Sequence, residues 1–92
     1  MHDMKRVEVQ NRFKRDMRRM RKRGADRRKL EHIVDILMRG EILPVSARPH
    51  KLSGEWNGFW ECHIESDWLL IYDVTDNAVL LAGTGSHADL FE

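Results

Sequence analysis

The sequence predicts an α+β domain in which two N-terminal helices pack on a small, mainly antiparallel sheet. A change of hydrophobic period supports this fold class. Between Asn11 and Gly40, apolar side chains recur at helical spacing, whereas residues 54–82 follow the period of two that is typical of strands. A chain of 92 residues is long enough for one hydrophobic core, so we expect a single domain over residues 1–92.

The helical half is preceded by a short strand that we expect over residues 4–9. Asn11 is a suitable N-cap for the first helix, and Gly24 can end that helix in the left-handed conformation. Asp26 is expected to cap a second helix, which Gly40 ends. The second helix has one apolar stripe, formed by Leu30, Ile33, Val34, Leu37 and Met38.

The sheet half begins after residues 43–53, which contain both prolines and are expected to form a loop. In the strand pattern that follows, one face is expected to carry Trp56, Trp60, Cys62 and Ile64, and the other Phe59, Glu61 and His63. Residues 67–74 predict a central strand, because their apolar run is denser: DWLLIYDV. A turn over residues 75–77 then leads to a third strand over residues 78–82.

The net charge of +1 conceals an uneven distribution along the chain. Residues 1–29 contain 13 Lys or Arg and four acidic residues, whereas residues 30–92 contain three Lys or Arg and 11 acidic residues. The many basic residues in this half favour binding to nucleic acid or to another acidic partner. The alternative is that these charges only keep one face of a helix in contact with water.

The composition disfavours a membrane-spanning protein and a secreted protein. No apolar run approaches the roughly 20 residues that cross a bilayer, and the first residues lack a signal-peptide pattern, so we expect a cytoplasmic protein without membrane contact.

Cys62 is the one cysteine, which excludes an intrachain disulfide and a cysteine-based zinc site. Its place in an alternating strand predicts a small buried side chain rather than a nucleophile.

Five polar residues are candidates for acid–base chemistry: His50, Glu61, His63, Asp67 and His87. Glu61 and His63 are two residues apart, so in a strand their side chains share a face at a spacing of about 7 Å. Histidine titrates near neutral pH, and several histidines with carboxylates suit a site that works without a cofactor. Taken singly, a histidine in a loop or at a strand edge is more often an exposed polar residue than a functional one.

Other kinds of site are less well supported by the spacing. A zinc site built from His50, His63, Asp67 and His87 is chemically allowed, but the sequence has no short paired spacing such as HxxxH. We therefore expect neither a metal nor a cofactor. The run GTGS lacks the lysine of a phosphate loop, and no GxSxG hydrolase motif is present.

Two longer stretches carry a family resemblance: HKLSGEWNGFWECHIESDWLLIYDV and the tail GTGSHADLF. They resemble the YafQ branch of the RelE/ParE superfamily of bacterial type II toxins, over roughly half of the chain from Leu43 to Phe91. The helical half agrees in layout more than in residue identity. The resemblance implies a compact fold like that of microbial ribonucleases. It also implies an mRNA interferase, a ribosome-dependent endoribonuclease that inhibits translation by metal-free cleavage and is silenced by a cognate antitoxin.

The resemblance further implies roles for individual residues. His50 is expected as general base and His87 as general acid, although these two assignments could be exchanged. His63 and Asp67 would orient the scissile phosphate and tune the histidines. Glu61, where the family often has an aspartate, would assist, and Phe91 would stack on a base or fix the tail. The expected partners are the ribosome, mRNA and the antitoxin, with the basic first helix against ribosomal RNA.

Two departures from the family pattern concern positive charge. Relatives commonly have an arginine at the position of Gly83, and many have one at the position of Trp60. Either Lys51 or Arg48, next to His50 in sequence, replaces the missing cation as a substrate-binding group, or the toxin is catalytically attenuated. An attenuated toxin would act only as an antitoxin- or ribosome-binding module. A third possibility, a gyrase inhibitor of the same fold, would have no use for the three histidines.

Overall fold

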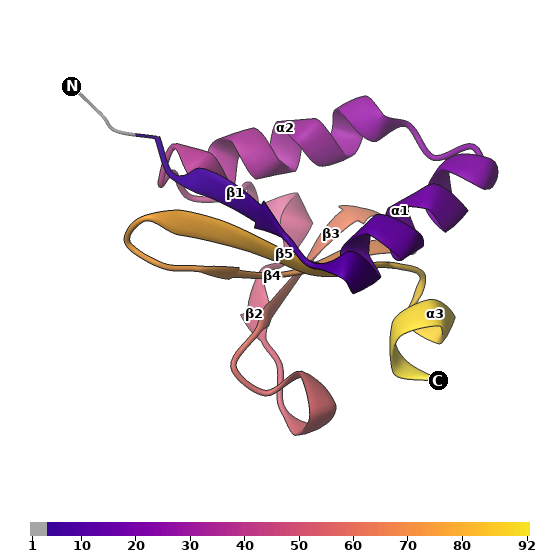
Figure 1. Ribbon diagram of the computed structural model, residues 1–92. Helices are drawn as coiled ribbons and strands as arrows, with labels where there is room; N and C mark the ends of the chain where they lie inside the picture. Colours follow the sequence, from indigo (N-terminus) through magenta and orange to yellow (C-terminus); the bar gives the residue numbers. More distant parts are fainter. Residues whose placement is uncertain (1–3) are drawn as a thin grey trace.

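Five strands form one sheet in the computed structural model, which describes residues 4–92 (Figure 1). They are β1 (Arg6–Val9), β2 (His50–Lys51), β3 (Trp60–Glu65), β4 (Trp68–Val74) and β5 (Ala78–Gly85). Their order is β1-β5-β4-β3-β2, and only the β1–β5 pair is parallel. The helices are α1 (Asn11–Lys22), α2 (Arg27–Met38) and α3 (His87–Phe91), with 3-10 turns η1 (Val45–Ala47) and η2 (Gly54–Trp56). The predicted α+β class is confirmed.

The two faces of the sheet are covered differently. Helices α1 and α2 lie over one face, whereas η2 and α3 lie on the other side (Figure 1). The helix-covered face holds the larger core, which includes Phe13, Met20, Leu30, Ile33, Leu37, Cys62, Leu70 and Leu81. The opposite face holds a smaller cluster of Leu69, Ile71, Ala82 and Leu90, with Leu52, Trp56 and Phe59 packed against it. This second face has less apolar cover and can therefore accommodate polar side chains.

The helix boundaries follow local signals closely. Helix α1 begins at Asn11 with Gln10 as its N-cap, one residue earlier than predicted. The side chain of Asp26 accepts a hydrogen bond from the Arg28 backbone N–H, so its predicted capping role is confirmed. Gly24 and Gly40, with φ angles of +89° and +70°, follow the two helices in the left-handed conformation that glycine tolerates.

The chain between the helices and β3 differs from the prediction in two ways. Residues 43–53 are not only a loop, because they contain η1 and the two-residue strand β2. Trp56 does not share a face with Trp60, because the chain turns through η2 and strand alternation begins only at Trp60. Trp56 instead packs edge-on against Phe59, with ring centroids 5.9 Å apart. The rest of the predicted alternation, from Phe59 to Ile64, agrees with the two clusters.

Strand β5 is longer than predicted. It continues to Gly85, so Gly83 and Thr84 pair with β4 instead of leaving the sheet. The predicted burial of Cys62 is confirmed, since its side chain is fully buried and burial raises the pKa of the thiol to about 12. At neutral pH this thiol is therefore protonated and unreactive. Within residues 4–92, no helix is long and apolar enough to cross a membrane.

Candidate active site

One row of register partners crosses the sheet face opposite α1 and α2. His50 pairs with Glu61, Glu61 with Ile71, and Ile71 with Gly83, so these four residues lie side by side on β2, β3, β4 and β5. We call them the register row. Register partners point to the same face of a sheet, which places His50 and Glu61 on the face that carries α3. His63 pairs with Leu69 of the same apolar cluster, so it follows Glu61 on this face.

His50 and Glu61 form a side-chain pair on this face. The Nε2 atom of His50 lies 3.4 Å from Oε1 of Glu61, whose side chain is only 4% exposed, whereas that of His50 is 54% exposed. The Nδ1 atom of His50 lies 3.1 Å from the carbonyl oxygen of Arg48. Arg48 has a φ of +48°, and this left-handed residue directs its carbonyl toward the imidazole.

These contacts determine how the His50 ring can exchange a proton. A carbonyl oxygen only accepts hydrogen bonds, so Nδ1 carries a hydrogen and donates it to Arg48. In the neutral ring, Nε2 is then the basic nitrogen, and it is the nitrogen beside Glu61. When Nε2 takes up a proton, the carboxylate supplies a counter-charge at close range. The Arg48 carbonyl therefore favours the hydrogen on Nδ1 and leaves Nε2 as the nitrogen that can exchange a proton.

His87 is the first residue of α3 and is positioned by its backbone. Its N–H donates to Oδ1 of Asp67 at 3.1 Å, which ties the start of α3 to the turn between β3 and β4. The His87 and Phe91 rings lie one helical turn apart, with centroids separated by 5.5 Å. Leu90 is buried, whereas Phe91 is 40% exposed. Leu90 therefore anchors the tail, and the Phe91 ring remains accessible next to His87.

The segment before α3 is fixed by buried polar contacts. Thr84 is fully buried, and its hydroxyl donates to the Leu69 carbonyl at 2.6 Å and accepts from the Trp68 indole at 2.8 Å. Gly85 has a φ of +153°, and a Cβ there would lie 2.8 Å from Asp89, so no larger residue fits. The Gly-Thr-Gly run therefore belongs to β5, and its buried contacts fix the position at which the tail leaves the sheet.

Asp16 links this segment to helix α1. Its side chain is buried, and its Oδ2 accepts from the Thr84 backbone N–H at 3.1 Å. Arg19 donates to Oδ1 at 2.9 Å, and Arg12 approaches Oδ2 at 3.4 Å. Sequence reasoning missed this residue. The available signal was an acid in the apolar stripe of α1, three residues after Phe13 and four before Met20.

A second ionic contact attaches α3 to the end of α1. Asp89 accepts from both terminal nitrogens of Arg23, at 2.6 and 3.1 Å. It also exchanges hydrogen bonds with Ser86 in a capping box. The Arg23 guanidinium, followed by the Ser86 backbone N–H, holds the pKa of Asp89 well below its usual range. Asp89 therefore stays ionised in mildly acidic solution.

The Asp89 contact predicts how the tail responds to acid. Because the folded-state pKa of Asp89 is depressed, its stabilisation is complete above about pH 4 and is lost as the pH falls through the folded-state value. The Trp56 indole N–H donates to the Leu90 carbonyl at 3.3 Å, so its NMR resonance reports whether α3 is docked. We expect Asp89→Asn to perturb this resonance already at neutral pH and to flatten its acid titration. Asp26→Asn, a cap on the distant α2, is the control; an unchanged Asp89→Asn titration would contradict the assignment.

The two cations predicted to assist His50 lie elsewhere. Lys51 is the register partner of Trp60, and its Nζ lies 5.9 Å from the Trp60 ring, on the helix-covered side of the sheet. Trp60 packs against the larger core, so position 60 also faces away from the register row. Beyond Glu61, β3 has no partner in β2 and forms the edge of the sheet, and at this edge Arg48 and His63 line a pocket of about 760 Å³ together with Arg28 and Lys29 of α2. Neither cation is brought next to Gly83.

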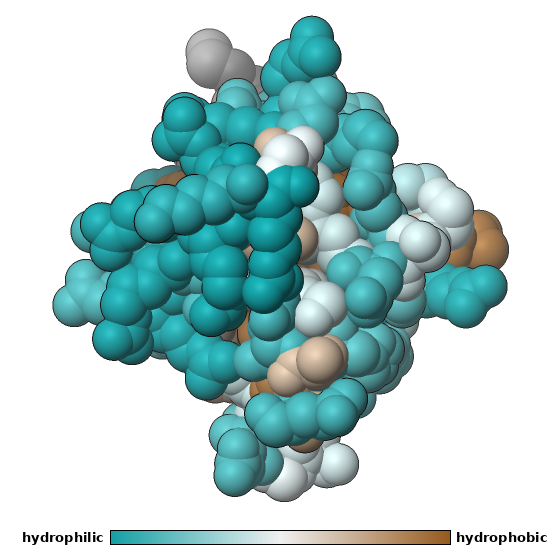
Figure 2. Space-filling view, turned by 90° about the vertical axis from the view of Figure 1, so that its right-hand side faces the viewer, coloured by the Kyte–Doolittle hydropathy of each residue, from teal (hydrophilic) through white to brown (hydrophobic). Residues whose placement is uncertain are grey.

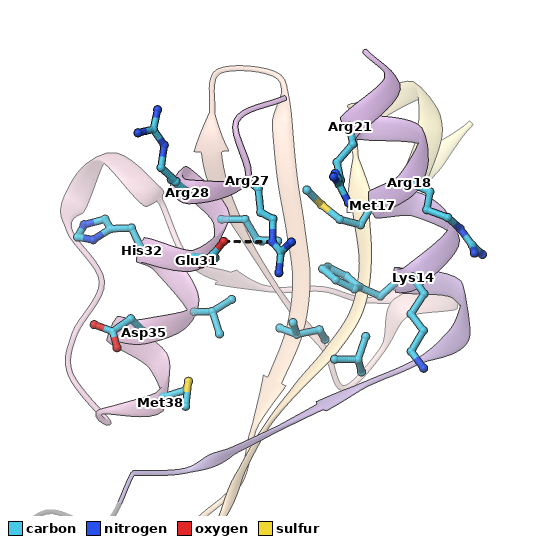
Figure 3. A pocket seen from close by; sticks show the side chains of 15 residues that line it. Lys14, Met17, Arg18, Arg21, Arg27, Arg28, Glu31, His32, Asp35 and Met38 are labelled. Atoms are coloured by element: carbon cyan, nitrogen blue, oxygen red, sulfur yellow. Dashed lines mark ion pairs between the residues drawn. The ribbon is translucent and has the colours of Figure 1, made fainter. Parts of the chain in front are cut away.

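A basic groove lies between α1 and α2 (Figure 3). Its volume is about 770 Å³, and Phe13, Leu30, Val34 and Leu81 contribute apolar lining. The rim carries Lys14, Arg18, Arg21, Arg27 and Arg28, with Arg27 paired to Glu31 at 3.1 Å. Hydrophilic side chains cover most of the side that bears α1 and α3 (Figure 2). The predicted basic helix is thus exposed along much of its length.

Metal ligands are not gathered at this face. Within the part of the chain that the structure describes, no group of three or more His, Cys, Asp or Glu is arranged to hold a metal ion. The ring of His50 lies beside the Glu61 carboxylate, whereas His87 contacts Asp67 through its backbone N–H. The His50–Glu61 side-chain pair suits proton transfer, and the His87 ring is left out of the contact with Asp67.

Comparison with known sequences identifies relatives along almost the whole chain. The family model for "Bacterial toxin of type II toxin-antitoxin system, YafQ" matches residues 5–92. The mRNA interferase toxin YafQ of Escherichia coli K12 is 35% identical over 86 residues, which cover 92% of this chain and 94% of that protein. The putative toxin YafQ of Haemophilus influenzae is 50% identical over 30 residues, which cover 33% of this chain and 29% of that protein.

Solved structures give the same result for the fold. YafQ in the crystal structure of the E. coli DinJ–YafQ toxin–antitoxin complex is similar with a TM-score of 0.87 and 33% identity, covering 97% of this chain and 99% of that one. A metal-bound toxin from Helicobacter pylori is similar with a TM-score of 0.88 and 32% identity, covering 96% of this chain and all of that one.

Proposed function

The chain belongs to the YafQ family of bacterial type II toxin–antitoxin toxins, and from this membership we propose that it is an mRNA interferase that cuts messages on the ribosome. The observation that carries the proposal is the His50–Glu61 pair on the open face of the sheet that also carries His87 at the start of α3. These groups can supply a base, an acid and a counter-charge without a cofactor.

The proposed reaction is transfer of the phosphoryl group within the RNA strand. His50 Nε2 takes the proton of the ribose 2′-hydroxyl, and the 2′-oxygen attacks the adjacent phosphorus. The bond from phosphorus to the 5′-oxygen breaks, and His87 gives that oxygen a proton. The products are a 2′,3′-cyclic phosphate and a free 5′-hydroxyl. Glu61 balances the charge on His50, and Asp67 holds the backbone of His87 in place.

The partners follow from the chemistry of the surface. Exposed arginines and lysines on α1 suit the phosphates of ribosomal RNA, and their contacts would make ribosome binding salt-dependent. The groove between α1 and α2 combines an apolar lining with a basic rim, which suits an acidic amphipathic segment of an antitoxin. A protein that works on ribosomes and is held by an antitoxin belongs in the cytoplasm.

The alternative function is a binding module without catalysis. It is motivated by Gly83, which leaves the register row without the cation that relatives commonly carry at this position. Such a protein would still occupy the ribosome or its antitoxin. It would retain the basic surface of α1 and the groove, so binding alone does not separate the two functions.

Primer extension on a reporter message from induced cells separates them. The enzyme is expected to give discrete cuts inside codons of the translated message, together with growth arrest. The same message without a ribosome-binding site is the control and should stay intact. His50→Ala should remove the cuts. Growth arrest with an uncut message would support the binding module and would overturn the proposed cleavage.

A further inference from the structure

Gly83 lies on the candidate active face, and because it has no side chain, β5 supplies no positive charge at this position. It ends the register row on β5, on the same face as Glu61 and His50. Neighbouring strands are about 4.8 Å apart, so the row spans roughly 14 Å from His50 to Gly83. A cation over Gly83 would therefore border the site.

The space over Gly83 is occupied by side chains from other elements. A Cβ on Gly83 would lie 3.3 Å from Trp56 Cη2, 3.3 Å from Asp16 Oδ2 and 3.5 Å from Leu90 Cδ2. The first two distances are shorter than ordinary van der Waals contacts, so a long side chain at this position would have to displace Trp56. In this chain the tryptophan takes the room that a side chain of residue 83 would need.

Arg12 of α1 reaches the same place. Its guanidinium carbon lies 4.9 Å from the centroid of the Trp56 ring. Its Nε lies 3.4 Å from Oδ2 of Asp16, the same oxygen that lies over Gly83. The guanidinium therefore lies over an aromatic ring and contacts a buried carboxylate through Nε.

The terminal nitrogens distinguish Arg12 from Arg19 and Arg23, the two other arginines that contact Asp16 or Asp89. Arg19 donates a terminal nitrogen to Asp16, and Arg23 donates both to Asp89. Within residues 4–92, the hydrogen bond of Arg12 uses Nε, and its terminal nitrogens have no acceptor. The Arg12 side chain is 43% exposed, so these two nitrogens are accessible to a ligand.

We propose that Arg12, stacked on Trp56 above Gly83, is the phosphate-binding cation of the active site. A guanidinium donates two parallel hydrogen bonds to a phosphate, which a lysine cannot do. Trp56 and Asp16 hold the donor before substrate arrives, so little reorganisation is needed when charge develops on the phosphoryl oxygens. The inference rests on the proposed function and explains how the chain can be active without an arginine at position 83.

The first part of the test measures cleavage by the purified protein on ribosomes carrying a defined message. Arg12→Gln is expected to lower the cleavage rate by about 10²–10³, because it removes a preorganised donor. Arg12→Lys keeps the charge but loses the paired donors, so its cleavage rate should lie between those of the wild type and Arg12→Gln. Arg39→Gln is the matched control, since it removes an exposed guanidinium at the end of α2, away from the site. An Arg12→Gln rate within about threefold of the control would overturn the proposal.

The second part detects phosphate binding without any cleavage. Adenosine 3′-monophosphate is titrated into the labelled protein while the Nε resonances of its arginines are followed by NMR. The Arg12 resonance is expected to shift until the nucleotide saturates its site, whereas the Arg39 resonance should not change. If Arg12→Gln loses cleavage but the Arg12 resonance does not shift, the residue only supports Asp16 and Trp56, and the proposal is wrong.

The two parts also separate this inference from the proposed function. A wild-type protein that shifts the Arg12 resonance but cuts no message would contradict the interferase function and leave the phosphate site supported. A wild-type protein that cuts while Arg12→Gln cuts equally well would leave the function standing and remove Arg12 from the site.

Discussion

Replacing His87 by alanine is expected to lower mRNA cleavage by a factor of about 10²–10⁴, the usual contribution of a general acid or base. Within residues 4–92, the imidazole makes no hydrogen bond that positions α3, because the contact with Asp67 uses the His87 backbone N–H. Ser86 and Asp89 cap the helix independently of it. The loss should therefore appear in the rate of the chemical step rather than in stability. It can be measured by single-turnover cleavage on ribosomes.

The control for this prediction is Glu92→Gln, which alters an exposed residue of the same tail and should cleave like the wild type. A substrate with sulfur in place of the 5′-oxygen then assigns the roles of the two histidines. A thiolate leaves without protonation, so this substrate should restore cleavage by the variant that lacks the general acid. Rescue of His87→Ala but not of His50→Ala would establish His87 as the acid. The reverse pattern would exchange the two roles, and full activity of His87→Ala on the normal message would remove it from the mechanism.

The helices and the central strands could be predicted from the sequence because their signals are local. The apolar stripe of α2 and its Asp26 cap lie within one run of residues, and the alternation in β3 places Glu61 and His63 on one face. The end of β5 could not be predicted in this way. Gly-Thr-Gly has the composition of a turn, and only tertiary contacts of Thr84 with Trp68 and Leu69 make it a buried strand.

The candidate site was predictable in its residue types but not in its arrangement. The pairing of His50 with Glu61 depends on the register between β2 and β3, which are separated by a loop with no repeating pattern. The position of Arg12 depends on three elements that meet over Gly83: α1, η2 and β5. Such long-range contacts leave no mark at fixed spacing in the sequence. For the same reason, the sequence suggested Lys51, a neighbour of His50 that projects to the opposite face.

Asp16→Ala is expected to destabilise the fold by about 2–3 kcal/mol, the largest stability effect that these contacts predict. The substitution leaves the buried N–H of Thr84 without its acceptor and removes the counter-charge of Arg12 and Arg19. These two arginines are each 43% exposed and can be rehydrated, so most of the cost comes from the N–H and the lost packing. Equilibrium unfolding in urea measures the change. Asp16→Asn retains one acceptor oxygen and should lose less.

Asp35→Ala is the matched control, because Asp35 also pairs with an arginine in a helix, but in solvent. Its contact with Arg39 is 3.1 Å long and about half exposed on both sides, so its loss should cost less than about 0.5 kcal/mol. If Asp16→Ala unfolds at the same urea concentration as this control, Asp16 does not hold α1 to β5. If it is destabilised as expected, cleavage should fall further than the folded fraction does, because Asp16 also orients Arg12 above Gly83. A loss of cleavage that only followed the folded fraction would confine Asp16 to stability.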